Sequence, residues 1–223
     1  MNSVASFGKL TFEIISSRTN RPIGDAKISI SDTATPENII EEVTTNSLGQ
    51  IEPIDLPAPP LDYSLEPSTE RPYSVYKLTI TAEGFEPIVI NGAEILPTQT
   101  AVQKASLLPV ATGEANSAEL FVIPDHTLYG EYPPKIAEDE IKPLDTSGEI
   151  VLSEVVIPEY VVVHDGPPTD QSANNYYVLY RDYIKNVASS EIYATWPEST
   201  LFANILAIQS FTLNRVFTEW YRN

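Results

Sequence analysis

The stretch KLTFEIISSRTNRPIGDAKISI, residues 9–30, decides the fold of the first part of this chain. Apolar and polar residues alternate over residues 10–14 and again over residues 26–30, with the period of half-buried β-strands. Residues 18–24, between the two runs, are a cluster of turn-forming types. Two alternating runs separated by turn residues predict neighbouring antiparallel strands.

The same pattern repeats outward from this stretch as far as Leu108. Its further apolar positions are Ile51, Ile54, Tyr76, Leu78, Ile80, Ile88 and Ile90. Turn signals lie between the runs, at residues 46–49, 83–84 and 91–92. Short strands at this spacing are typical of a sandwich. We therefore predict that residues 1–108 form an antiparallel β-sandwich.

Composition and charge exclude several classes of function. The 223 residues carry a net charge of −18. So acidic a surface repels nucleic acid phosphates and anionic membranes, and we expect neither as a partner. No run of about 18 apolar residues is present to span a membrane. With no cysteine and only two histidines, disulfides, thiolate metal sites and histidine-rich metal cages are excluded. We predict neither a metal nor a cofactor.

Residues 109–159 differ in composition from the rest of the chain. Eleven acidic residues stand against two lysines, and prolines interrupt the segment repeatedly. This predicts an extended acidic linker with short ordered pieces. Its aromatic patches, at Phe121 and at residues 126–129, suggest that it lies along a surface. The acidic run at residues 138–140 could bind a cation, but a solvated linker is the simpler interpretation.

The last segment, residues 160–223, changes from strand to helix. Residues 160–164 predict one strand, and the apolar residues recur three and four apart from Tyr180 to Ile192, as in an amphipathic helix. Trp196-Pro197 then precedes a second helix, from about Glu198 to Tyr221. Several residues of this helix sample different faces and predict burial on most sides: Leu201, Ile205, Ile208, Thr212, Arg215 and Phe217. A sandwich followed by a linker and helices makes the chain α+β.

Three sets of residues resemble known families. Arg21-Pro-Ile-Gly-Asp-Ala26 and Thr44-Thr-Asn-Ser-Leu-Gly49 resemble the carboxypeptidase regulatory-like sandwich, of transthyretin or Ig type. YIKNVASSEIYATWP, residues 183–197, with the helix that comes after it, resembles the core motif of the stage II sporulation protein D family of peptidoglycan lytic transglycosylases. Nearly the whole chain is similar to precursors of clostridial spore cortex-lytic enzymes, including LDYSL (61–65), HTLY (126–129), YPPK (132–135) and YVVVHDG (160–166).

The cortex-lytic resemblance implies a complete plan for the chain. Residues 1–108 would belong to a propeptide that a germination protease removes, and residues 160–223 would begin a catalytic domain that continues beyond Asn223. Peptidoglycan is the implied substrate, and the spore cortex or coat of a spore-forming bacterium is the implied location. Residues 1–9 hold no basic start followed by an apolar run. A missing signal peptide is compatible with a spore wall that forms inside the mother cell.

The resemblance also implies that Glu191 is the catalytic acid. Glu191 lies three residues after Ala188 and seven after Ile184, so we expect its carboxyl on the apolar side of its helix. Burial favours the neutral carboxyl that a general acid needs. A lytic transglycosylase needs no second carboxylate, because the 6-hydroxyl of the muramic sugar attacks in place of water. From the residues alone, a solvated glutamate, or one paired with Lys185 or Arg215, is the commoner arrangement.

Other candidates are weaker, and the substrate-binding residues stay unassigned. His164 and Asp165 could form an acid–base pair, although a histidine at a strand end is more often structural. Ser189 and Ser190 have no evident histidine base. Trp196 could stack on a sugar, but packing at a helix junction is the simpler interpretation. A second class of function stays open, a non-enzymatic structural or assembly protein, for example of a phage tail-like particle, that reuses the same scaffold.

Overall fold

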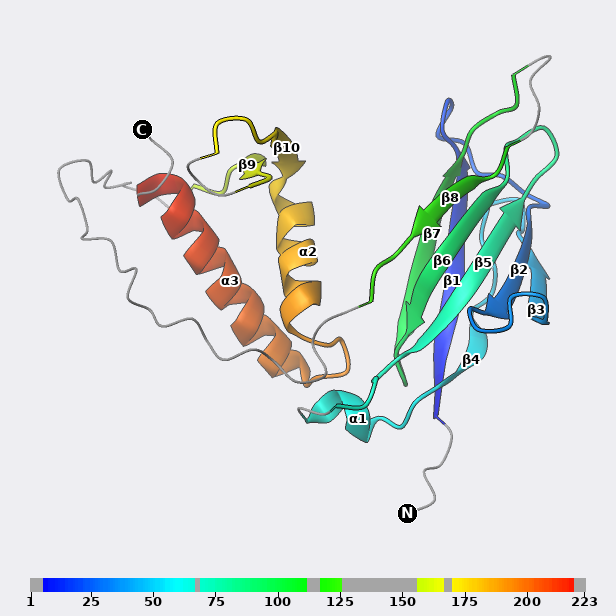
Figure 1. Ribbon diagram of the computed structural model, residues 1–223, viewed down its shortest axis with the longest axis horizontal. Coiled ribbons are helices and arrows are strands. Elements are labelled where there is room, and N and C mark those ends of the chain that lie inside the picture. The colour runs from blue at the N-terminus through cyan, green and yellow to red at the C-terminus, as the bar shows by residue number, and fades with distance from the viewer. Residues whose placement is uncertain (1–5, 67–68, 112–116, 126–155, 167–169, 219–223) are drawn as a thin grey trace. The chain divides into compact units, whose positions relative to one another are not determined.

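The structure, a computed structural model, describes residues 6–66, 69–111, 117–125, 156–166 and 170–218. The chain divides into two compact units, Met1–Gly130 and Glu131–Asn223, and each is described by itself (Figure 1). Strands dominate the described part of the first unit, and helices dominate that of the second.

The first unit is a β-sandwich. Its described elements are β1 (Ser6–Ser16), β2 (Lys27–Asp32), β3 (Ile39–Thr44), β4 (Ile54–Ala58), α1 (Asp62–Leu65), β5 (Ser74–Thr81), β6 (Ile88–Ile95), β7 (Thr100–Leu107) and β8 (Glu119–Val122). One sheet has the strand order β4-β1-β7, and the other has the order β3-β2-β5-β6-β8. The sandwich in an α+β chain is therefore confirmed.

Strand direction is mixed in both sheets of the sandwich. Most neighbours run antiparallel, as the sequence predicts, but β7 pairs with β1 in parallel and β8 pairs with β6 in parallel. Both parallel strands lie at a sheet edge. A parallel neighbour needs a crossover rather than a hairpin, and β7 reaches β1 by leaving the sheet that holds β6. The local pattern of turns carried no signal for such a crossover.

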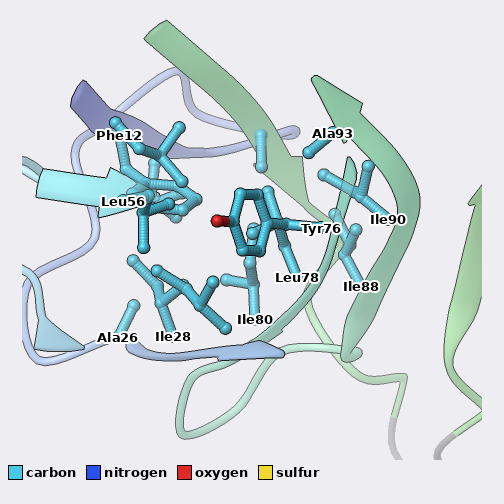
Figure 2. Packing of buried hydrophobic residues seen from close by; sticks show 14 of the residues in the cluster. Phe12, Ala26, Ile28, Leu56, Tyr76, Leu78, Ile80, Ile88, Ile90 and Ala93 are labelled. Atoms are coloured by element: carbon cyan, nitrogen blue, oxygen red, sulfur yellow. The ribbon is translucent and has the colours of Figure 1, made fainter. Parts of the chain in front are cut away.

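The core lies between the two sheets, where alternate residues of the strands point inward. Leu10, Phe12 and Ile14 of β1 face this core, as do Ile28 and Ile30 of β2, and all five are at most 1% exposed. Figure 2 shows the Tyr76 ring in the middle of the cluster. Its hydroxyl donates a hydrogen bond of 2.6 Å to the carbonyl oxygen of Pro57 in β4, so this side chain ties the two sheets together.

One buried side chain, Thr45, joins the two turns at residues 21–26 and 44–49 that carry the resemblance to the regulatory-like sandwich. The Thr45 hydroxyl donates to the carbonyl oxygen of Ile23 at 2.8 Å and accepts from the N–H of Ala26 at 3.0 Å. In the second turn the side-chain oxygen of Asn46 accepts from the N–H of Leu48 at 2.9 Å. The motif residues therefore satisfy the backbone of both turns, which explains in physical terms why they occur together.

The second unit combines a hairpin with two helices. Its described elements are β9 (Tyr160–His164), β10 (Asn175–Leu179), α2 (Tyr180–Glu191) and α3 (Glu198–Thr218). β9 and β10 are antiparallel, and β10 runs directly into α2. Val161 of the hairpin is buried together with Ile184 and Ala188 of α2 and Ile208 of α3. None of the helices in the described residues is long and apolar enough to cross a membrane.

One sequence expectation, the end of the sandwich at residue 108, changes. β8 lies inside the predicted linker and extends the sandwich past residue 108, because its backbone pairs with the edge of β6. Phe121 of β8 is exposed on this strand. The patch at residues 126–129 and the acidic run at residues 138–140 lie outside the described residues.

Candidate functional site

Glu191 is the last residue of α2 and stands at the junction between the two helices of the second unit. The next residue, Ile192, has an extended backbone, with φ −142° and ψ 148°. Its N–H still donates to the carbonyl oxygen of Ala188 at 3.0 Å, which completes the last helical turn. The helix therefore ends because the chain straightens at Ile192, and Glu191 takes the terminal position.

The expected burial of Glu191 is wrong. The residue is exposed, whereas Ile192 and Tyr193 directly after it are buried. The helical spacing correctly placed Ile184 and Ala188 on the apolar side of the helix, since both are buried. At the end of a helix no further turn covers the terminal side chain, and the chain that leaves the helix takes up the space against the core instead. The argument from burial for a neutral carboxyl does not apply here.

Neither of the basic partners considered for Glu191 pairs with it. The Nζ atom of Lys185 lies 3.4 Å from a carboxylate oxygen of Asp182. The guanidinium of Arg215 lies over the ring of Phe211, 4.8 Å from its centre. Within the part of the chain that the structure describes, Glu191 forms no ion pair, so its carboxylate faces solvent.

The junction after Glu191 is a tight turn. The N–H of Trp196 donates to the carbonyl oxygen of Tyr193 at 3.1 Å. The Pro197 carbonyl oxygen then accepts from Thr200 and Leu201, which starts α3 one residue after the proline. Trp196 is half-buried and packs against the helical cluster. Its position fits packing at a helix junction.

The two serines before Glu191 are not arranged as nucleophiles. The hydroxyls of Ser189 and Ser190 both donate to the carbonyl oxygen of Asn186, each at 2.9 Å, as helical serines commonly do. His164 lies in the hairpin at the opposite end of α2. Its Nδ1 is 2.8 Å from the side-chain oxygen of Asn175. An amide oxygen can only accept, so this contact requires a hydrogen on Nδ1.

One carboxylate near His164 is stabilised as an anion. Asp170 accepts hydrogen bonds from the hydroxyl and the N–H of Ser172, at 2.6 and 2.9 Å. These bonds, with a smaller effect of the nearby His164, hold the pKa of Asp170 below its ordinary value. The described residues contain no group of three or more histidines, cysteines, aspartates or glutamates that could hold a metal ion.

Within the described residues, helix α3 is covered on one face only, which corrects the expectation of broad burial. Ile208 and Thr212 are buried, and Leu201 and Ile205 pack beside them. These four residues recur every three or four positions and therefore share one face. The rest of the helix surface carries exposed apolar side chains: Phe202 at 59%, Leu206 at 62% and Phe211 at 60%. Nothing is described of the Phe217 side chain.

Sequence reasoning missed the strand β10 and its tyrosines. Tyr176, Tyr177 and Val178 form a run of strand-favouring residues directly before α2. That run could have predicted a strand, but its apolar and polar residues do not alternate, and the strand was therefore missed. The strand brings Tyr177 beside β9, at the position opposite Val162.

No protein-family model matches this chain, and no curated protein matches it. Similar solved structures include the TIE protein of Bacillus anthracis, with 17% identity and a TM-score of 0.34 over 47% of this chain. They also include GBS52, the minor pilin of Streptococcus agalactiae, with 15% identity and a TM-score of 0.34 over 51% of this chain. A third is the 5-hydroxyisourate hydrolase of Klebsiella pneumoniae, with 14% identity and a TM-score of 0.30 over 46% of this chain and 92% of that one. The chain spans 17% of the length of the first and 49% of the second. Such likeness concerns the fold alone.

Proposed function

We propose that this chain is the precursor of a peptidoglycan lytic enzyme of the spore cortex type, in which Glu191 is the general acid and base. The observation that carries the proposal is the exposed carboxylate at the end of α2, within the stretch of residues 183–197 that resembles the lytic transglycosylase motif. A polymeric substrate can reach an exposed group directly. In the same proposal, residues 1–108 belong to the propeptide that a germination protease removes.

The reaction uses one carboxyl group twice. Glu191 gives its proton to the oxygen that links the muramic sugar to the next residue, and the bond from the anomeric carbon to that oxygen breaks. The 6-hydroxyl oxygen of the same muramic sugar forms a new bond to the anomeric carbon. Its proton passes to the Glu191 carboxylate, which restores the acid. No water is consumed, so no second carboxylate is needed to activate one.

The exposed position of Glu191 sets a condition on this chemistry. Proton transfer to a glycosidic oxygen is most effective where the surroundings exclude water and hold the reacting groups in place. The described residues leave the carboxylate in solvent. Bound glycan, or further chain laid over the end of α2, would supply the cover. Activity is therefore expected to depend on that cover as well as on Glu191.

The test is mass spectrometry of spore cortex peptidoglycan after incubation with this chain and with the complete product of its gene. We expect 1,6-anhydromuramic ends from the active form and their loss in Glu191→Gln. Glu198→Gln is the matched control, because Glu198 is also exposed and begins α3 on the other side of the junction. Anhydro ends that persist in Glu191→Gln would remove the role of this residue. No anhydro ends with either protein would refute the enzyme.

A second candidate function is a non-enzymatic assembly protein. The exposed apolar residues of α3 favour it, because a large apolar surface usually contacts another molecule. The same experiment separates the two candidates. An assembly role predicts no anhydro ends at all, together with self-association or capture of a partner that changes when Phe202 and Phe211 are replaced by serine.

A further inference from the structure

The outer face of the β9–β10 hairpin carries two tyrosines side by side. Residues that point the same way along the two strands are Tyr160, Val162 and His164 in β9 and Asn175, Tyr177 and Leu179 in β10. The other face of the hairpin, with Val161, packs on the helices. Tyr177 is 79% exposed and Tyr160 is 50% exposed. The outer face is therefore an aromatic surface that the described residues leave open to solvent.

The register of the hairpin places the two rings within reach of one ligand. Tyr177 is directly opposite Val162, and Tyr160 comes two residues before Val162 in β9, so the tyrosines are diagonal neighbours. Diagonal pairs in an antiparallel ladder lie roughly 7–8 Å apart, within reach of aromatic side chains. Two such rings can each take one of two neighbouring units in an extended chain.

Polar groups lie at the end of this aromatic surface. His164 and Asn175 are opposite each other and are joined through Nδ1 and the amide oxygen at 2.8 Å. That bond uses the acceptor end of the Asn175 amide, and its NH₂ group is the donor that this exposed side chain can offer a ligand. The two tyrosine hydroxyls add groups that both donate and accept.

These observations favour a saccharide as the occupant. The C–H face of a pyranose ring packs on an aromatic ring, while its hydroxyl and acetamide groups form hydrogen bonds. Tyrosine supplies contact area of this kind with little loss of side-chain freedom. The face itself carries no carboxylate, and the net charge of −18 disfavours anionic nucleic acids and lipids. A neutral glycan meets no such repulsion.

We infer that the outer face of the β9–β10 hairpin is a glycan-binding surface, with Tyr160 and Tyr177 as stacking residues and Asn175 as a hydrogen-bond donor. The choice of an N-acetylated glycan as the ligand rests on the proposed function. Strand β10 of the hairpin leads directly into α2 (Figure 1), and Glu191 is the last residue of α2. The surface therefore lies roughly 16 Å from Glu191 along the helix. The surface therefore holds the glycan strand at a distance from the glycosidic bond that is cut.

The experiment measures binding of the N-acetylglucosamine hexamer and of purified cortex glycan strands by calorimetry, in a Glu191→Gln background that leaves the ligand uncut. Tyr177→Ala and Tyr160→Ala are each expected to weaken binding about tenfold. Tyr176→Ala is the matched control, because Tyr176 is 49% exposed in the same strand but points to the opposite face. It is expected to bind within about twofold of the parent.

The outcomes separate this inference from the proposed function. If glycan binding depends on the tyrosines but the active form produces no anhydro ends, the glycan-binding surface stands and the proposed enzyme is refuted. If anhydro ends form but glycan binding is absent, or is unchanged in both tyrosine variants, the proposed enzyme stands and the glycan-binding surface is refuted. Tyrosine-dependent binding of a proline-rich peptide and of neither glycan would overturn it as well, since the face would then recognise a polypeptide.

Discussion

A substitution at Gly49 tests how closely the second turn of the sandwich fits against strand β1. Gly49 has a φ of +71°, in the left-handed region that glycine adopts without cost. A Cβ atom at this position would lie 2.3 Å from the carbonyl oxygen of Ile14 and 3.2 Å from the N–H nitrogen of Ile23. Those two atoms are hydrogen-bonded to each other at 3.0 Å. Alanine at Gly49 must therefore displace backbone on both sides.

Gly84 supplies a matched control for the same change. Its φ is +80°, and a Cβ atom there would meet nothing within 4 Å. Gly84→Ala is expected to cost about 1 kcal/mol for the left-handed backbone alone. Gly49→Ala adds the displacement of packed backbone, about 1–3 kcal/mol more. The effect of alanine on the unfolded chain is the same in both variants and cancels in the comparison.

The assay is thermal unfolding of the full chain, followed by far-ultraviolet circular dichroism. Both tryptophans, Trp196 and Trp220, belong to the second unit, so their fluorescence serves as an internal reference. We expect a lower melting temperature for both variants, by about 4 °C for Gly84→Ala and roughly 10 °C for Gly49→Ala. Equal losses would show that the left-handed backbone, and not the close approach to Ile14, determines the need for glycine at both turns.

Two further predictions test the helical core and the buried tyrosine. Ile208→Ala removes a buried side chain of α3 and should lower the free energy of unfolding of the second unit by about 2–4 kcal/mol. Leu206→Ala changes an exposed side chain and should lower it by less than about 0.5 kcal/mol. Tryptophan fluorescence during denaturation measures both losses, and equal losses would contradict the described orientation of α3. Burial raises the pKa of Tyr76 above its ordinary value of 10.0. Between pH 10 and the higher folded pKa, the folded state therefore keeps the phenol proton that the unfolded state releases. The stability that this group contributes is complete below pH 10 and declines as the pH rises through the higher folded pKa. Urea midpoints at pH 8 and pH 11 should therefore fall further in the parent chain than in Tyr76→Phe, and an identical fall in both would refute this effect of burial.

The strands that could be predicted are those with a buried and an exposed face. In β1 the alternation is complete, because every second side chain enters the core, and in β2 it holds from Lys27 to Ile30. β3 could not be found in this way, since five of its six residues are exposed and it only closes a sheet edge. β8 is exposed along its whole length. Its pairing comes from backbone hydrogen bonds to β6, which leave no period in the side chains.

Glu191 shows where helical spacing stops being sufficient. The period correctly placed Ile184 and Ala188 inward, and it would place Glu191 on the same side. Whether such a position is covered depends on the path of the chain after the helix ends. Ile192 leaves the helix with an extended backbone and is itself buried, so the terminal carboxylate stays in solvent. For the proposed enzyme this difference is useful, because a glycan can approach an exposed carboxylate and then cover it.

Helix α3 is the case in which composition left the choice of face open. Residues 201–214 include no charged side chain, so no polar stripe identifies the outer face. Contact with α2 selects the face of Ile208 and Thr212. The buried Thr212 is tolerated because its hydroxyl donates to the carbonyl oxygen of Ile208 at 2.8 Å. Leu206 and Phe211 would fill the same core as well by hydrophobicity alone, so hydrophobicity does not decide which side of α3 is buried. That choice is made by the packing against α2, which covers Ile208 and leaves Leu206 and Phe211 exposed.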